Sequence, residues 1–194
     1  KKEKRQSVAS ILIGFAVLMF GMDTMRAAVK PLAQEPAFTG ILTAFSNPVL
    51  GMLAGVVLTA MIQSSSASVG ILQALCLSGA VGYNTAIPII LGQNIGTCVT
   101  AMISGVGASR NARRAALVHL YFNIIGTVVF MGVFYLLDAA FQFPFMEKPA
   151  DALGIAVVHS CFNVSATLLL LPFSRGLVKL ACLTTGGGVQ EQSH

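Results

Sequence analysis

Six apolar stretches follow one another along the chain, separated by short polar segments. They span residues 8–30, 48–62, 67–78, 86–107, 115–137 and 153–172. A helix needs about 20 apolar residues to cross the hydrocarbon layer of a bilayer, which is ~30 Å thick. The first, fourth, fifth and sixth stretches reach that length. The pattern therefore predicts an all-α integral membrane protein with four membrane-crossing helices.

The second and third stretches are too short to cross a membrane. As helices they would extend only about 22 and 18 Å, at ~1.5 Å per residue. Between them lies the sequence IQSSSAS, in which Gln63 is followed by Ser64, Ser65 and Ser66. Polar groups of this kind are costly in hydrocarbon unless they are paired. Two half-length helices joined by a polar tip predict a re-entrant hairpin over residues 48–78, with its tip near the middle of the membrane.

The fourth stretch, residues 86–107, carries polar residues at its centre. Pro88 precedes the run GQNIGT at residues 92–97. Proline removes a backbone donor and glycine relaxes the backbone, so we expect this helix to break there. A broken helix at membrane depth is tolerated only where protein or a water-filled cavity satisfies its backbone groups. The sequence therefore predicts two polar breaks, each between half-helices.

The composition supports a membrane protein. Hydrophobic residues make up 55% of the chain and charged residues 10%, with a mean hydropathy of +0.80, whereas soluble domains carry about 25% charged residues. The 12 Lys and Arg residues outnumber the 7 Asp and Glu residues, which could indicate either a nucleic-acid partner or a membrane orientation. We expect free thiols, because no metal-ligand spacing relates the four cysteines, Cys76, Cys98, Cys161 and Cys182.

The positions of the basic residues along the chain distinguish a nucleic-acid partner from a membrane orientation. If the N-terminus is cytoplasmic and residues 48–78 re-enter from outside, nine of the 12 Lys and Arg residues face the cytoplasm, as the positive-inside rule expects. Reading the hairpin as one full crossing would place the three arginines of SRNARR outside. We therefore predict no nucleic-acid partner and a multi-pass protein of the cell (cytoplasmic) membrane with both termini in the cytoplasm. Residues 1–7 and 176–194 would be cytoplasmic segments flanking a transmembrane unit at residues 8–175.

Breaks between half-helices can bind ions. A helix that begins after a break offers free N–H groups and a positive dipole, which favour an anion. A helix that ends at the break offers free carbonyls, which suit a hard cation such as sodium. The pattern predicts a secondary transporter that couples an anion to sodium. The candidate anion ligands are Ser64, Ser65, Ser66 and Asn94, and the candidate sodium ligands are Gln63, Gln93, Thr97 and Thr100.

A second repeated pattern contains histidines. VHLYFNIIGT and VHSCFNVSAT share five residue types at identical offsets, and each places a His four residues before an Asn: His119 with Asn123, and His159 with Asn163. Residues four apart share a helix face. Intramembrane histidines suggest a metal site or a proton relay, but no Asp, Glu or Cys is spaced to complete a zinc site. We interpret both pairs as polar helix contacts that support the hairpin.

Three motifs resemble the bacterial sodium/phosphate cotransporter family, which is related to the vertebrate type II transporters. They are NPVLGMLAGVVLTAMIQSSSAS, GQNIGTCVTAMI and ARRAALVHLYFNIIG, in this order, and the similarity runs over about residues 10–175. The resemblance implies two inverted repeats, each with a Gln-Ser-Ser hairpin followed by a broken helix. Phosphate and sodium would bind between the hairpins, and no organic cofactor is implied.

The chain carries one such hairpin and looks like the second repeat of that family. The resemblance therefore implies a missing first-repeat half, in the same parent chain or in a partner. A parallel homodimer would not replace an inverted half. A pair with opposite orientations could, although the charge bias argues against it. We read the chain as half of a transporter embedded in the lipid bilayer, with inorganic phosphate and sodium as its ligands.

Other interpretations of the polar residues stay open. Ser, Thr, Gln and Gly can join transmembrane helices without binding a ligand, and Gly51 and Gly55 are interpreted as such close-packing points. A channel would typically need symmetric repetition around a pore. An enzyme using a serine nucleophile would need an oriented base, so we expect none. The alternative function is a structural or channel-like membrane subunit without phosphate coupling.

Overall fold

The computed structural model describes residues 2–31 and 35–186, and these form helices joined by short turns. An isolated bridge joins Gly82 and Pro149. The helices are α1 Lys2–Val29, α2 Pro36–Ala44, α3 Pro48–Ile62, α4 Ser65–Leu77, α5 Tyr83–Gly96, α6 Cys98–Ser104, α7 Arg110–Phe141, α8 Ala152–Leu170 and α9 Ser174–Thr184, with a 3-10 turn at Leu171–Phe173 between α8 and α9.

Four helical segments are long and apolar enough to cross a membrane. They are Glu3–Ala28, Tyr83–Ser104, Arg110–Phe141 and Ala152–Thr184, whereas Pro48–Ile62 and Ser65–Leu77 are shorter apolar helices. These segments correspond to the four long and two half-length apolar helices that the apolar pattern predicts. The expectation of an all-α, multi-pass membrane protein is therefore confirmed.

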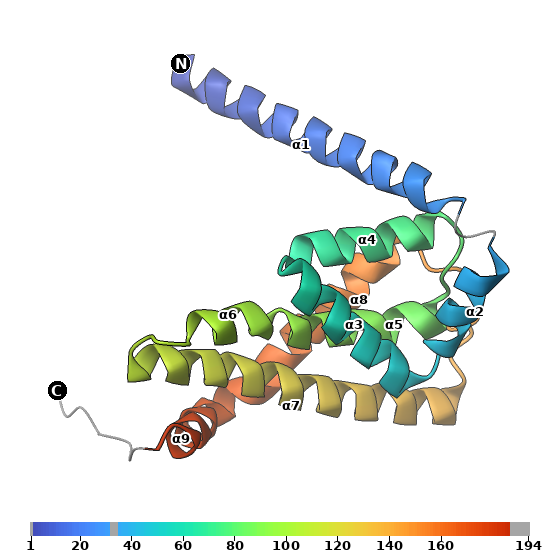
Figure 1. The fold of residues 1–194 in the computed structure, drawn as a ribbon. Coiled ribbons are helices and arrows are strands. Elements are labelled where there is room, and N and C mark those ends of the chain that lie inside the picture. Colours follow the sequence, from blue (N-terminus) through green and yellow to red (C-terminus); the bar gives the residue numbers. More distant parts are fainter. Residues whose placement is uncertain (1, 32–34, 187–194) are drawn as a thin grey trace.

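The basic segments lie on the same side of the fold, although the N-terminal end of α1 stands apart from the other helices (Figure 1). The N-terminal end of α1, the α6–α7 turn and α9 lie on this side, while α2 and the α4–α5 and α7–α8 connections lie on the other (Figure 1). The arginines of SRNARR begin α7, and Arg175 and Lys179 belong to α9. This arrangement agrees with the charge pattern used to predict the orientation. Which end faces the cytoplasm stays a prediction.

Helix α5 lies at the centre of the fold. All of its residues from Thr85 to Asn94 are buried, which suits a helix without a polar face. Around it, Leu72 of α4 and Phe162 of α8 join the core. The ring of Phe162 meets that of Phe130 edge-on, with centroids 5.4 Å apart.

Glycines bring the backbones of α3 and α5 into contact. A Cβ atom added at Gly55 would overlap the carbonyl of Ile89, and one added at Gly92 would overlap the carbonyl of Met52. Small residues allow such close approach between membrane helices. The close-packing role expected for the glycines of GMLAG is therefore confirmed at Gly55.

The helix expected to break at its centre is interrupted only at Thr97, the last residue of the predicted break, where α5 ends and α6 begins one residue later. The expected interruption covers residues 92–97, but α5 continues through Gly96, and Thr97 N–H donates to Gln93 O at 3.1 Å. Thr97 itself keeps helical dihedral angles, with φ −61° and ψ −25°. The glycines that suggested a break serve instead as contact points for α3, and this packing stabilises the helix. Gln93 and Asn94 therefore project from the last turn of α5, before the interruption at Thr97.

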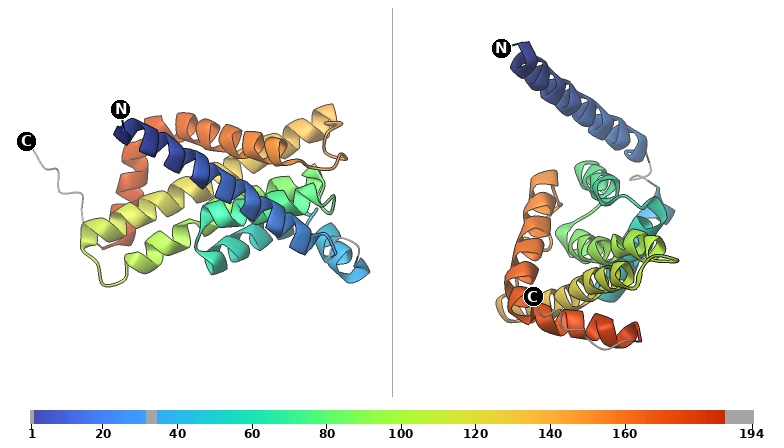
Figure 2. Two further views of the ribbon diagram at one scale, coloured as in Figure 1. Left: turned by 90° about the horizontal axis from the view of Figure 1, so that it is seen from above. Right: turned by 90° about the vertical axis from the view of Figure 1, so that its left-hand side faces the viewer.

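The segment expected to be a C-terminal tail, residues 176–194, contains most of α9. Pro172 lies in the 3-10 turn that ends α8, and α9 then runs across the direction of α7 (Figure 2). Leu177, Ala181 and Cys182 of α9 are buried. Residues 187–194 of the expected tail lie outside the described residues.

Candidate functional site

The chain reverses at Gln63 and Ser64, between α3 and α4. Gln63 adopts φ 56° and ψ 23°, a left-handed conformation, and its N–H donates to Thr59 O at 2.8 Å. Ser64 is extended and caps α4, since its Oγ accepts from Ala67 N–H at 3.3 Å. Non-glycine residues with positive φ are uncommon, and such strain concentrates at functional sites.

The hairpin has the shape that the sequence predicts, with a tighter tip. The outer ends of α3 and α4 point to the same end of the bundle, and the tip lies partway along α7 (Figure 1). Of the five residues 62–66 expected to be non-helical, only Gln63 and Ser64 lie outside the helices. Ser65 and Ser66 form the first turn of α4, because a serine cap starts the helix at once.

The tip presents polar groups at its surface. Gln63, Ser64, Ser65 and Ser66 are all exposed. The first turn of a helix carries backbone N–H groups without intrahelical partners, and its dipole favours negative charge. The serine hydroxyls stand at this turn, so the arrangement is suited to an anion.

A buried polar cluster lies one turn behind the tip. The hydroxyls of Thr59 and Ser68 are 2.6 Å apart, and both residues are fully buried. Gln93 Nε2 donates to Ser68 O at 3.0 Å. The cluster therefore joins α3, α4 and α5, and it connects Gln93 with the base of the hairpin tip.

The carbonyl oxygen of Gln93 is buried without a partner. Gln93 is 2% exposed, and the structure gives its Oε1 no hydrogen bond among the described residues. An unpaired buried polar group costs about 1–3 kcal/mol, and in a native protein it calls for an explanation. An amide oxygen is a ligand that hard cations accept. Gln93 Oε1 is therefore a candidate ligand for a cation such as sodium.

The remaining candidate ligands form other contacts. Asn94 Nδ2 donates to Ile90 O at 2.9 Å, and its Oδ1 lies 3.1 Å from His159 Nε2 on α8. Thr97 Oγ1 donates to Asn94 O at 2.6 Å, within the same helix region. Thr100 is exposed on α6. In the described part of the chain, Gln93 bonds to Ser68, one turn behind the hairpin tip. The bonds given for Asn94 and Thr97 go to other partners.

The two histidine motifs have equivalent local structures. Asn123 Nδ2 donates to His119 O at 3.0 Å, and Asn163 Nδ2 donates to His159 O at 2.8 Å. His119 O also accepts from Cys98 Sγ at 3.6 Å, so this motif joins α7 to α6. These bonds support the interpretation as helix contacts. Within residues 2–31 and 35–186, no three His, Cys, Asp or Glu side chains come close enough to hold a metal ion.

Sequence reasoning missed Thr59 and Ser68. Each is a single hydroxyl residue within an apolar helix, which by itself is typical of helix packing. One signal was available: Gly51, Gly55 and Thr59 recur every four residues and so form one small-residue face on α3. A polar residue on the face that contacts α5 would have been a candidate for the buried cluster.

Comparisons with known proteins place the chain in a family. The model of the Na+/Pi-cotransporter family matches residues 17–147. Uncharacterized protein YqeW of Bacillus subtilis is 38% identical over 176 residues, which cover 90% of this chain and 56% of YqeW. Sodium-dependent phosphate transport protein 2B of Homo sapiens is 35% identical over 132 residues, which cover 63% of this chain and 19% of that protein.

A third relative is similar over a shorter stretch of the chain. Sodium-dependent phosphate transport protein 2A of Rattus norvegicus is 41% identical over 92 residues, which cover 44% of this chain and 14% of that protein. No solved structure matches the chain significantly. The chain thus spans little more than half the length of YqeW and less of the two mammalian proteins. The family model covers most of the chain, including the hairpin and α5, and the chain therefore belongs to the Na+/Pi-cotransporter family.

Proposed function

We propose that this chain supplies one half of the site of a transporter that moves inorganic phosphate together with sodium across the cell membrane. The observation that carries the proposal is the hairpin tip at Gln63 and Ser64, where one helix ends and another begins. One turn behind it, Ser68 O accepts from Gln93, whose amide oxygen is buried and unpaired. Family membership supports phosphate and sodium as the two ligands. The re-entrant placement of the tip in the membrane is part of the proposal.

The start of α4 is the proposed phosphate contact. Ser64, Ser65 and Ser66 present hydroxyls at a helix N-terminus, where N–H groups and the helix dipole favour an anion. Exposure of the tip lets a ligand reach it from the side that the chain does not cover. Asn94 remains a proposed phosphate ligand only if a rearrangement frees it from His159.

The end of α3 and Gln93 are the proposed sodium contacts. The last turn of α3 ends in backbone carbonyls that point toward the break, and Gln93 Oε1 is a buried acceptor without a partner. Sodium bound there would place a positive charge next to the phosphate contact. Each ligand would then strengthen the binding of the other by linkage. Thr97 and Thr100 would join only in another conformation.

The other half of the site is proposed to come from an inverted counterpart. The tip of the hairpin is exposed, and the relatives that match this chain are longer than it. A first-repeat half, in the same parent chain or a partner, would present a second hairpin across the ligands. A dimer of two such units is compatible with this arrangement.

Uptake into vesicles tests the function. The complete transporter in proteoliposomes should take up labelled phosphate when a sodium gradient is applied, and not under an equal potassium gradient. Ser65→Ala should raise the phosphate concentration for half-maximal uptake about ten- to hundredfold, because one charge-assisted donor is lost. Ser160→Ala, at an exposed serine of α8, is the matched control and should have no effect. Equal uptake under both gradients would refute sodium coupling, and an unchanged phosphate constant for Ser65→Ala would refute the tip as the phosphate contact.

A further inference from the structure

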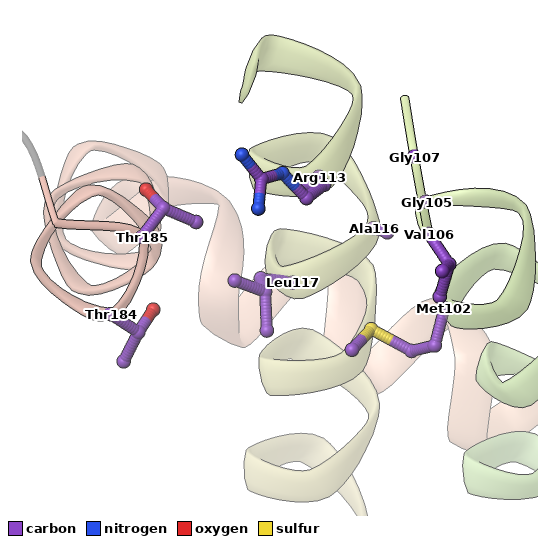
Figure 3. Close-up of a pocket in the computed structure, with 9 residues that line it drawn as sticks. All are labelled: Met102, Gly105, Val106, Gly107, Arg113, Ala116, Leu117, Thr184 and Thr185. Carbon is purple, nitrogen blue, oxygen red and sulfur yellow. The ribbon is translucent and has the colours of Figure 1, made fainter. Parts of the chain in front are cut away.

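A cleft of about 430 Å³ lies at the basic end of the bundle, away from the hairpin. It is bounded by the α6–α7 turn, the first turns of α7 and the end of α9 (Figure 3). One part of its wall is apolar, formed by Met102, Val106 and Leu117. The other part is polar, formed by Arg113, Thr184 and Thr185.

Two arginines meet the polar wall. The guanidinium of Arg113 extends from α7 toward Thr185 (Figure 3). Arg114 Nε donates to Thr185 Oγ1 at 3.2 Å, which joins the start of α7 to the end of α9. Guanidinium groups bind phosphate oxygens through paired N–H donors. The cleft is therefore equipped for a phosphate group.

The segments around the cleft carry charge of one sign. Residues 104–117 and 171–186 contain five basic residues and no Asp or Glu, the basic residues being Arg110, Arg113, Arg114, Arg175 and Lys179. Basic residues next to a transmembrane segment attract anionic lipids, at about 1 kcal/mol for each residue near the surface. An anion in the cleft would meet no opposing carboxylate from these segments.

The position of α9 suggests that the cleft lies at the membrane surface. The bundle helices end here, and α9 runs across them (Figures 1 and 2). α9 buries Leu177 and Ala181 against the bundle and exposes Arg175 and Lys179, an amphipathic pattern typical of helices that lie in the interface. Phospholipid phosphates occupy the same layer.

We propose that this cleft binds the phosphate group of an anionic phospholipid. Arg113 holds the phosphate oxygens while Arg114 fixes Thr185 at the polar wall, and Met102 and Val106 contact the apolar part of the lipid. Free inorganic phosphate offers the same oxygens, but it would leave the apolar wall without a partner. The lipid would bridge α7 and α9 and so hold α9 against the bundle. The site is separate from the transport site and does not depend on it.

Lipid titration tests the proposal. The protein in detergent micelles is titrated with dioctanoyl phosphatidylglycerol, and bound lipid is counted by native mass spectrometry. Dioctanoyl phosphatidylcholine, which carries no net charge, is the comparison lipid. The phosphatidylglycerol should bind with a stoichiometry near one and the phosphatidylcholine much more weakly. Equal binding of the two lipids would overturn the proposal.

Matched arginine variants locate the site. Arg113→Gln should weaken phosphatidylglycerol binding about tenfold or more, because a charge-assisted contact is lost. Arg110→Gln, three residues earlier on α7, is the control: Arg110 is exposed and does not line the cleft. It should change binding by less than about fivefold, because one exposed charge contributes at most about 1 kcal/mol. Equal weakening by the two variants would show general charge attraction and overturn the site.

Two further measurements separate loss of the lipid contact from misfolding and from binding of free phosphate. Arg113→Lys keeps the charge but not the paired donors, so its affinity should lie between those of the original protein and Arg113→Gln. It thus reports on the site even if Arg113→Gln folds poorly. Displacement of the lipid by millimolar inorganic phosphate would overturn the lipid assignment and give the cleft to the free anion.

Discussion

Gly92 is predicted to be the most sensitive glycine of the chain. It lies on α5 against the backbone of α3, and a Cβ atom added there would overlap the carbonyl of Met52 and lie 3.0 Å from Met52 Cα. The atoms that it meets are backbone, which cannot move aside by changing a rotamer. Gly92→Ala therefore forces α3 and α5 apart, although alanine is the better helix former.

The size of the effect follows from overpacking. Inserting a methyl group into a well-packed interior costs about 1–3 kcal/mol, occasionally more. For a chain of 150–250 residues, 1 kcal/mol corresponds to about 2–4 °C in melting temperature. Gly92→Ala should thus lower the melting temperature by about 2–12 °C. Because α3 carries the hairpin tip, the shift should also weaken sodium-dependent phosphate uptake.

The melting temperature is measured with a dye that becomes fluorescent when it reacts with a cysteine thiol. Cys76, Cys98 and Cys182 are buried and free, so they react as the protein unfolds, whereas the exposed Cys161 is first replaced by serine. Gly132→Ala on α7 is the control, since a Cβ there meets nothing within 4 Å. If Gly92→Ala melts at the same temperature as the control, α3 and α5 do not approach as closely as the structure shows.

Two other predictions concern a contact and the orientation. His159→Gln should preserve stability and the pH dependence of uptake, since the amide can still donate to Asn94 Oδ1. His159→Leu should destabilise the protein by about 1–3 kcal/mol because that buried oxygen loses its partner. A changed pH profile for His159→Gln would revive the proton-relay interpretation. In cells, Glu147→Cys should react with an impermeant maleimide from outside and Asn111→Cys should not, both positions being exposed. Labelling of Asn111→Cys would contradict the predicted orientation.

Much of the fold could be predicted because one physical constraint dominates it. The length of apolar segments is fixed by the membrane, so the four crossings and the two half-length helices followed from the sequence. The hairpin turn was also predictable, because Ser64 is a strong cap and ends the apolar run. Such local signals depend on neighbouring residues only.

The errors arose where a residue has two possible roles. Gly92 can break a helix or allow a close contact, and only the position of α3 decides which applies. Thr97 and Thr100 follow the same motif as Gln93, but Thr97 Oγ1 bonds to Asn94 O and Thr100 is exposed. α9 was overlooked because the tail is short, although Arg175 and Lys179 alternate with Leu177 and Ala181 at helical spacing.

The central claim is that Gln93 Oε1 is a sodium ligand. Gln73 on α4 provides a matched comparison, because its Nε2 donates to Ala152 O at 3.1 Å much as Gln93 Nε2 donates to Ser68 O at 3.0 Å. Gln73→Leu and Gln93→Leu each remove one amide and one bond to a backbone carbonyl. The amide oxygen of Gln93 is fully buried and unpaired.

The most direct measurement is the sodium concentration that gives half-maximal phosphate uptake in proteoliposomes, for these two variants and the original protein. Gln93→Leu should raise it about ten- to hundredfold, the effect of losing a ligand to a charged group, and phosphate affinity should fall with it by linkage. Gln73→Leu should leave it unchanged. An unchanged sodium requirement in Gln93→Leu, or equal shifts in the two variants, would contradict the account.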